Sequence, residues 1–225
     1  MINNNYKIKD IAVFSFGRKK SNRVKNKLLK KFGRTTLTDI VLKKLRVFNK
    51  QSFFAGYDNV FREKCSIHGV RFVKRNYKSS IIDSPITSIL HFLKQQNYKK
   101  FIIINACAPF LKISTIKNFI KFCQQEPDSP AFTIIKKNNF FLDNKYNPIN
   151  FNNNLKTINT KKVNSIYEFA HTLYYFDKDF FFKNKRYWNY KNLRYFELKN
   201  KYEQIDIDTI DDFILAEKIW INDHK

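Results

Sequence analysis

IAVFSFGRKKSNRVKNK, residues 11–27, is the stretch of sequence that sets the fold of this chain. Its first part, residues 11–16, is a short apolar run that Gly17 ends, and such a run predicts a buried strand. The rest is basic. The later segment TTLTDIVLKKLRVF, residues 35–48, has apolar positions at helical spacing, with Thr35 or Thr36 as N-cap. A buried strand, a basic loop and an amphipathic helix in this order indicate the first unit of an α/β fold.

Strand and helix signals then alternate along most of the chain, which favours an α/β fold throughout. In residues 84–96, SPITSILHFLKQQ, Ser84 is the expected N-cap and Pro85 the first helical residue. Further strands are expected at residues 52–56, 70–74, 101–105, 131–135, 166–176 and 190–198. Further helices are expected at residues 58–69, 113–125 and 209–220, the last one with Thr209 and Asp212 as a capping box.

Residues 136–163 break this alternation. The segment is polar, rich in Asn and without helical periodicity, so it is either an extended arm or a long loop. Long loops of compact domains are usually functional or part of an interface. We expect residues 1–225 to form one domain that carries this segment.

The composition is that of a folded, soluble protein. Of the 225 residues 43% are hydrophobic, which is enough for the core of one domain. The opening decapeptide is polar and basic, so no signal peptide is expected, and the longest apolar stretch, residues 101–111, is too short to span a membrane. Three scattered cysteines indicate neither a disulfide framework nor a zinc site, and they favour a reducing compartment. The expected location is the cytoplasm.

The formal net charge is +24, from 43 Lys and Arg against 19 Asp and Glu. One explanation is binding to nucleic acid through phosphate neutralisation. The alternative is compositional drift, because only nine of the basic residues are Arg and the excess of Lys comes with an excess of Asn, Ile, Phe and Tyr. The basic residues are spread along the whole chain, which favours the second explanation.

The basic loop after the first strand is a candidate phosphate site. Ligands of open α/β sheets bind at the carboxyl ends of the strands, and there Arg18, Ser21, Arg23 and Lys27 would surround a polyphosphate. The loop matches neither the GxGxxG nor the Gly-Lys-Ser/Thr pattern. From composition alone, a solvated basic loop remains an equal alternative.

Asp206 and Asp208 form a second candidate site. At alternate positions of an expected strand their carboxylates would project to the same face, where they suit a hard cation such as Mg²⁺. The alternative is a polar strand end before a capped helix. In the expected strand at residues 166–176, His171 is ambiguous and could face a substrate, whereas Cys107 is expected to be a small buried residue.

Three motifs together resemble the acylneuraminate cytidylyltransferase family. IAVFSFGRKKSNRVKNKLLKKFG (11–33) resembles the family's opening, in which Arg, Ser and Lys at the positions of Arg18, Ser21 and Lys27 contact the phosphates of CTP. NACAPFL (105–111) is similar to the family's Q-P-T-S-P-L-R. IDIDTIDDFILAE (205–217) is similar to D-I-D-T-x-x-D-x-x-x-A-E, whose aspartates bind the metal.

This resemblance implies a Rossmann-like, three-layer nucleotidyltransferase domain of GT-A-like type, with a mostly parallel sheet and an extended arm. It implies that CTP is bound by the loop residues, with Arg75 and Ser84 as further contacts, and that Asp206 and Asp208 hold Mg²⁺. Residues 140–168 resemble the family's dimerisation region, which implies a homodimer. The acceptor side is expected to include Asn105, Lys161, Glu168 and His171.

The departures from the family pattern concern the loop and the acceptor side. Lys19 and Lys20 replace the family's two glycines, and His171 lies in the segment where the family has Asn-Gly-Ala. The expected activity is transfer of CMP to an acidic sugar of the nonulosonate type for a surface polysaccharide. The alternatives are the same transfer to Kdo or to a phosphonate, a nucleic-acid-binding α/β protein, and a glycosyltransferase with Asp206-Ile207-Asp208 as its D-x-D motif.

Overall fold

Strand β1, Ile11–Gly17, lies inside a seven-stranded sheet with the order β5-β4-β1-β6-β8-β7-β9. The computed structural model describes residues 10–223 except 82, 155 and 158, so the opening residues 1–9 lie outside the described part. The other strands of the sheet are β4 Ser52–Gly56, β5 Arg71–Lys74, β6 Lys100–Ile104, β7 Ala131–Lys137, β8 Ile166–Asp177 and β9 Arg194–Glu197. A separate short hairpin consists of β2 Lys31–Phe32 and β3 Thr35–Thr36.

The sheet is parallel from β5 through β4 and β1 to β6. β8 runs antiparallel to both β6 and β7, while β9 is parallel to β7. The carboxyl ends of β1, β4 and β6 therefore meet at one edge, where the loops that follow these strands build a site.

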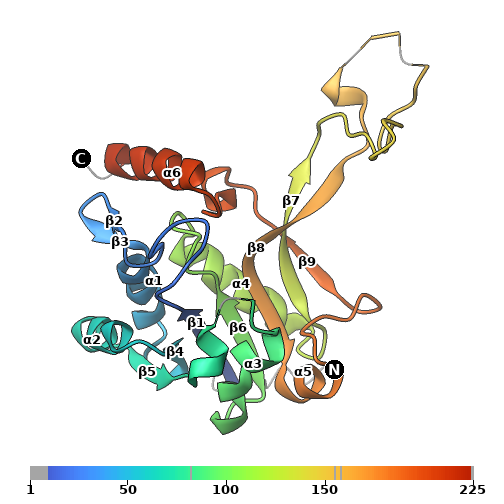
Figure 1. Cartoon of the computed structure of the whole chain (residues 1–225). Coiled ribbons are helices and arrows are strands. Elements are labelled where there is room, and N and C mark those ends of the chain that lie inside the picture. Colours follow the sequence, from blue (N-terminus) through green and yellow to red (C-terminus); the bar gives the residue numbers. More distant parts are fainter. Residues whose placement is uncertain (1–9, 82, 155, 158, 224–225) are drawn as a thin grey trace.

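Helices cover both faces of this sheet (Figure 1). Side chains alternate along β1, so Val13 contributes to a core with helices α1, α2, α4 and α6 on one face. Phe14 contributes to a core with α3, α5 and the 3₁₀ turn η4 on the other face. The helices are α1 Leu37–Arg46, α2 Asn59–His68, α3 Ile86–Ile89, α4 Ile113–Gln125, α5 Lys178–Asn184 and α6 Ile210–Asp223. This three-layer α/β arrangement confirms the expected fold class. Among the described helices, none combines the length and apolar character needed to cross a membrane.

Local capping signals in the sequence agree with the helix ends. Thr36 caps α1, since its side chain accepts a hydrogen bond from the backbone N–H of Asp39. Before α6, Asp212 accepts from the backbone N–H of Thr209, and the N–H of Asp212 donates to the Thr209 hydroxyl. These bonds satisfy N–H groups that a helix start leaves without partners.

The expected helix over residues 84–96 was wrong. The structure has only the four-residue α3 followed by the 3₁₀ turn η4, His91–Gln95. The side chain of Ser84 does not cap α3, whose N-cap is Pro85, because the hydroxyl donates instead to the carbonyls of Lys78 and Ile81. Ser84 therefore stabilises the loop between β5 and α3.

The segment 203–208 is not a strand of the sheet, contrary to the sequence-based expectation. Its first two residues belong to the 3₁₀ turn η6, Tyr202–Gln204, and the rest is held by a backbone hydrogen bond from Ile207 to the carbonyl of Cys107. Ile207 is fully buried, which fixes the segment between Asp206 and Asp208 against the loop after β6. A strand would have a ladder of hydrogen bonds to its neighbour in place of this anchor.

The polar segment between β7 and β8 extends away from the rest of the chain (Figure 1). It contains the isolated bridge between Leu142 and Pro148 and the 3₁₀ turn η5, Thr160–Lys162. Asn150 is its buried centre, since its side chain bonds to the backbone of Asn139, Phe141 and Asn164. We call the part of the chain at 138–165 the arm.

Candidate active site

A cavity of about 700 Å³ opens at the carboxyl ends of β1 and β6. Its walls come from the loop after β1, the turn after β5, the start of α3, the loop after β6 and the middle of β8. The residues predicted from the sequence that line it are Arg18, Ser21, Arg23, Lys27, Arg75, Ser84, Asn105 and His171. The topology thus brings together residues that lie more than a hundred positions apart in the chain.

The loop after β1 begins where Gly17 fits tightly against the core. A Cβ atom on Gly17 would lie 2.6 Å from Leu28 Cδ1 and 2.9 Å from Phe54 Cζ, so no larger residue fits without movement. Val24, 2% exposed, anchors the loop from below. Lys19 and Lys20 are not among the described residues with positive φ, and within this loop only Asn26 is. The loop therefore needs no glycine at the two lysine positions.

Arg75 joins two walls of the cavity, the end of β1 and the turn after β5. Arg75 is 3% exposed, and its guanidinium donates to the carbonyl of Gly17, to the carbonyl of Ser79 and to the Ser79 hydroxyl. Burial, together with the charge of Arg18, lowers the pKa of Arg75 to about 10. In the described part of the chain neither arginine pairs with a carboxylate, so both leave positive charge available to an anion in the cavity.

Asp206 and Asp208 lie on the segment anchored by Ile207. Asp206 Oδ1 accepts a hydrogen bond of 3.1 Å from Asn105 Nδ2. Burial first, and then the charge of Asp208, raise the pKa of Asp206, while the charges of Lys27 and His171 oppose the rise. The two carboxylates are thus close enough to repel each other, and a cation would relieve that repulsion.

Asp208 pairs with cations of the loop after β1. Its Oδ1 lies 3.0 Å from Arg23 Nη2 and 3.6 Å from Lys27 Nζ. The Lys27 ammonium also donates to the carbonyl of Ile207. The residues predicted to hold phosphates are therefore in contact with those predicted to hold a metal, although Asp206 and Asp208 lie beside the cavity and are not among its lining residues.

The carboxylate pair fits Mg²⁺ by its chemistry. Mg²⁺ in proteins is commonly bound by one or two carboxylates together with water and substrate phosphates. No group of three or more Asp, Glu, His or Cys side chains that suits a metal occurs among residues 10–223 outside the undescribed positions. Asp206 and Asp208 would thus supply the protein ligands, and the remaining ligands would be water and phosphate oxygens.

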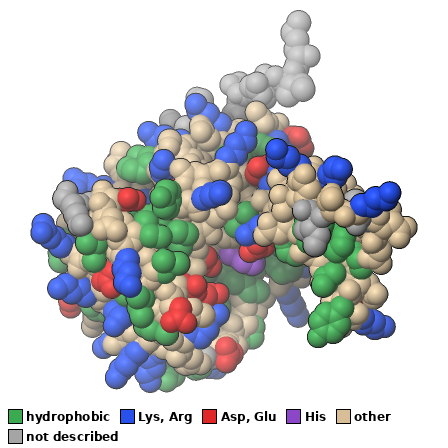
Figure 2. Space-filling view, turned by 90° about the horizontal axis from the view of Figure 1, so that it is seen from above, with side chains coloured by type: hydrophobic (Ala, Val, Ile, Leu, Met, Phe, Trp, Pro, Cys, Tyr) green, Lys and Arg blue, Asp and Glu red, His purple; other side chains and the backbone are tan. Residues whose placement is uncertain are grey.

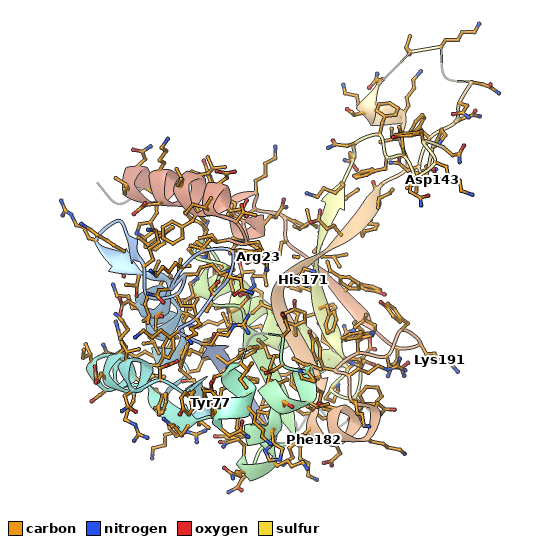
Figure 3. The ribbon with its side chains drawn as sticks, viewed as in Figure 1. Arg23, Tyr77, Asp143, His171, Phe182 and Lys191 are labelled. Carbon is orange, nitrogen blue, oxygen red and sulfur yellow. The ribbon has the colours of Figure 1, made fainter. Side chains whose placement is uncertain are left out.

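His171 occupies a bulge of β8. Between the pairs Phe132–Tyr174 and Ile134–Phe169, β8 uses more residues than β7, and His171 takes up a positive φ of 51° there. Its Nδ1 lies 2.6 Å from the Tyr174 hydroxyl, and its carbonyl accepts a hydrogen bond from Asn105 Nδ2. Figure 2 shows a histidine in the hollow between the main body and the arm. In Figure 3, His171 and Arg23 lie near this hollow, whereas Asp143 lies far out on the arm.

Two residues predicted for the acceptor side do not reach the cavity in this chain. Lys161 lies exposed in η5 on the arm. Glu168 pairs with Lys137 at 3.1 Å, near the base of the arm. Neither lines the cavity.

The structure adds residues that the sequence analysis did not select. Tyr174, Tyr187 and Ser79 line the cavity, and burial raises the pKa of both tyrosines. The aromatic content of β8 was visible in the sequence, but only the bulge decides which of its tyrosines turns toward His171. Cys107 also lines the cavity, and burial raises the pKa of its thiol to about 11, so it is not a reactive thiolate at neutral pH.

Cationic side chains facing paired carboxylates at the carboxyl ends of parallel strands suit a nucleotide with its phosphates, and with this fold they define a nucleotidyltransferase. Within that class, the chain belongs to the cytidylyltransferase family, because the model of that family matches residues 16–220. The enzyme class expected from the sequence is thereby confirmed. A search of curated proteins gave no match.

Solved structures of similar fold include CMP:2-keto-3-deoxy-manno-octonic acid synthetase complexed with CTP, with a TM-score of 0.68 and 10% identity over 95% of this chain and 99% of that one. 4-Diphosphocytidyl-2C-methyl-D-erythritol synthase from Anaerococcus prevotii has a TM-score of 0.62 and 13% identity, covering 93% and 95% of the two chains. A cytidylyltransferase from Leptospira borgpetersenii has a TM-score of 0.58 and 14% identity, covering 92% and 85%. At these identities the similarity is one of fold.

Proposed function

We propose that the chain transfers CMP from CTP to a small acidic sugar of the nonulosonate type and releases pyrophosphate. The observation that carries this proposal is the contact of Arg23 and Lys27, which line the cavity, with Asp208 beside it. Such an arrangement suits a substrate that brings both phosphates and a divalent cation. The product would serve the synthesis of a surface polysaccharide in the cytoplasm.

The triphosphate would lie against the loop after β1. Arg18, Arg23 and Lys27 would neutralise its oxygens, and Ser21 would donate a hydrogen bond. Arg75 and Ser84 would support this wall, since both hold the turn that follows β5. The acceptor oxygen then attacks the α-phosphorus, the bond from that phosphorus to the bridging oxygen breaks, and pyrophosphate leaves. Positioning and charge neutralisation supply most of the rate in such transfers.

Bound Mg²⁺ would supply neutralisation of charge on the phosphate oxygens during this transfer. Asp206 and Asp208 would hold it, and Asn105 would orient the Asp206 carboxylate through their 3.1 Å hydrogen bond. Arg23, freed from Asp208, would then turn to phosphate. The ion pair is largely exposed, so its exchange for phosphate costs little.

The acceptor would lie beside β8, near Asn105 and His171. The imidazole is held at Nδ1 by Tyr174, which leaves Nε2 for a hydroxyl or carboxylate of the acceptor. Lys161, on the arm, and Glu168, near its base, would take part only in a homodimer, where the arm of one subunit would approach the partner. Exposed apolar side chains on the arm, Leu142, Tyr146 and Ile149, support that interface. Sedimentation analysis of the chain, with and without residues 138–165, measures the oligomeric state.

The acceptor is tested with CTP, Mg²⁺ and a panel of compounds, by the release of pyrophosphate. The panel contains a nonulosonate, Kdo and 2-aminoethylphosphonate, with glycerol phosphate as a control. Release that is at least about tenfold faster with the nonulosonate than with the others supports the proposal. Faster release with Kdo or the phosphonate would replace the acceptor and keep the transfer, and no release with any compound contradicts the proposed function.

Removing the partly buried carboxylate charge at Asp206 should stabilise the metal-free protein. The raised pKa of Asp206 means that the folded state disfavours its charged form, and this cost is fully present at pH values above the raised pKa. Asp206→Asn keeps an acceptor for Asn105 and removes the repulsion with Asp208. We expect Asp206→Asn to have a higher Tm than wild type at pH 7.5 with chelator. Mg²⁺ should narrow this difference in Tm, because it should stabilise only wild type.

Thermal unfolding with and without MgCl₂ measures this effect, and Asp211→Asn is the control for loss of a carboxylate nearby. A Tm below that of wild type for Asp206→Asn without metal would contradict the assignment of Asp206 to the metal. An equal rise in Tm with Mg²⁺ for Asp206→Asn and Asp211→Asn would contradict it as well.

Replacing His171 by glycine should separate backbone strain from side-chain function. At a φ of 51° a non-glycine residue pays about 1 kcal/mol that glycine does not. His171→Gly should therefore unfold at the same denaturant concentration as wild type or a higher one, while its KM for the acceptor rises about tenfold or more. His171→Ala keeps the strain and should share the KM effect without the gain in stability. An unchanged KM in both variants would remove His171 from the acceptor site.

A further inference from the structure

Lys44 is a buried lysine on α1 outside the cavity described above. It is 7% exposed, and its ammonium donates hydrogen bonds of 2.8 Å to the carbonyls of Ala108 and of Pro109. Burial lowers the pKa of Lys44 to about 7, and the charge of Glu203 opposes the fall. The other charged residues around it, Lys43, Lys112 and Asp223, line a second cavity on that side of the chain. Burial of an amine costs more free energy than burial of an apolar side chain, so a specific role for Lys44 is indicated.

The two carbonyls that Lys44 binds belong to the loop after β6, whose other end forms the active-site wall. Asn105 begins this loop and binds the Asp206 carboxylate, and the carbonyl of Cys107 accepts the hydrogen bond from Ile207. The loop therefore carries two of the contacts that place residues 203–208, which we call the aspartate segment.

A hydrogen bond of Glu203 also holds the aspartate segment to the loop after β6. Glu203 is 4% exposed, and its Oε1 accepts a 2.7 Å hydrogen bond from the backbone N–H of Lys112. Lys44 thus holds the first end of the stretch 108–112 by the carbonyls of Ala108 and Pro109. Glu203 holds the other end by the backbone amide of Lys112. The charges of Lys44 and Glu203 attract each other across this stretch.

We propose that Lys44 is a positioning residue of the transfer reaction, which fixes the loop after β6 from beneath and so aligns Asn105 and Asp206 with the bound triphosphate. The role rests on the proposed function of the cavity. A neutral amine still donates both hydrogen bonds, so the role belongs to the donor atoms rather than to the charge. Without them, the buried carbonyl of Pro109 loses the Lys44 bond and that of Ala108 keeps only its bond from the N–H of Leu111, so the loop is free to shift.

The test compares Lys44→Met, which keeps the length and removes the donors, with Lys44→Arg, which keeps donors. Lys43→Met is the matched control, because Lys43 is the exposed neighbour on the same helix. Two quantities are measured for each variant: kcat and KM for CTP, and hydrogen–deuterium exchange in peptides that cover 105–112, 203–208 and, as a reference, β4.

We expect Lys44→Met to lower kcat by about 10- to 100-fold with KM for CTP changed by less than about threefold. Exchange should accelerate in 105–112 and 203–208 but not in β4, Lys44→Arg should recover part of both effects, and Lys43→Met should resemble wild type. If Lys44→Met does not fold, the same comparison is made with Lys44→Leu, which likewise lacks the donors.

Wild-type kcat in a folded variant that lacks the donors would overturn the proposal, and so would faster exchange spread evenly over the sheet. The exchange experiment needs no substrate. If wild-type protein releases no pyrophosphate with any acceptor, the proposed function fails, while unchanged exchange in 105–112 and 203–208 shows separately that Lys44 does not position them.

Discussion

Asp208→Asn is expected to lower CTP-dependent pyrophosphate release by about a thousandfold or more at saturating substrate. A metal ion that neutralises phosphate oxygens contributes several kcal/mol to transition-state stabilisation, and about 4 kcal/mol corresponds to this factor. Asparagine keeps the shape of the side chain and removes the charge that holds the cation. The measurement is steady-state release over a range of MgCl₂ concentrations.

The same substitution should leave the fold intact. Asp208 is 49% exposed at its side chain, and its partner Arg23 is 64% exposed, so loss of this ion pair costs less than about 1 kcal/mol. Asp211→Asn serves as the control, since Asp211 is an exposed carboxylate in the first turn of α6. A folded Asp208→Asn variant with turnover near that of wild type would remove Asp208 from the metal site.

The strands and most of the helices were predictable because their signals are local. The apolar run before Gly17 forms β1, and the N-cap at Thr36 and the capping box at Thr209 begin the helices expected there. The segment after Pro85 was not predictable in this way. Its apolar residues have helical spacing, but the chain turns after four residues so that Leu90, Phe92 and Leu93 pack under the sheet. Tertiary packing decided that element.

The site was predictable to the extent that it lies at the ends of strands. Arg18, Lys27 and Asn105 follow β1 and β6, and parallel strands place such loops side by side. The bulge at His171 arises from the pairing of β8 with β7, which no local pattern in the sequence specifies. For the same reason, the sequence did not distinguish Tyr174, which contacts His171, from the other aromatic residues of β8.

The net charge of +24 is not concentrated in the site. Lysine and arginine side chains are spread over the face seen in Figure 2, among neutral and acidic ones, rather than gathered into one stripe. Binding of nucleic acid through such a surface would depend steeply on salt and would be indifferent to Asp208. The cations that line the cavity are instead held in place by the fold, as shown by the anchoring of Lys27 and Arg75 to backbone carbonyls. This arrangement favours a small polyanion over a duplex.

Lys27→Met should lower kcat/KM for CTP by about 10²- to 10³-fold. The side chain of Lys27 is 11% exposed, so its charge acts on a phosphate through a poorly solvated site, where such a contact contributes more than at the surface. The variant also loses the hydrogen bond to the carbonyl of Ile207, which helps to hold the aspartate segment. Both losses act on the same step, so kcat should fall together with affinity for CTP.

Two further variants separate the charge of Lys27 from its place in the loop. Lys27→Arg keeps the charge and should retain at least about tenfold more activity than Lys27→Met, although a planar guanidinium does not reproduce the contacts of an ammonium. Lys25→Met removes an exposed charge two residues away and should leave kcat/KM within about twofold of wild type at physiological salt. Equal losses in Lys25→Met and Lys27→Met would mean that the loop attracts CTP only by its overall charge. A loss confined to Lys27 means that one ammonium, held by the carbonyl of Ile207 beside Asp208, joins the phosphate wall of the cavity to the carboxylates next to it.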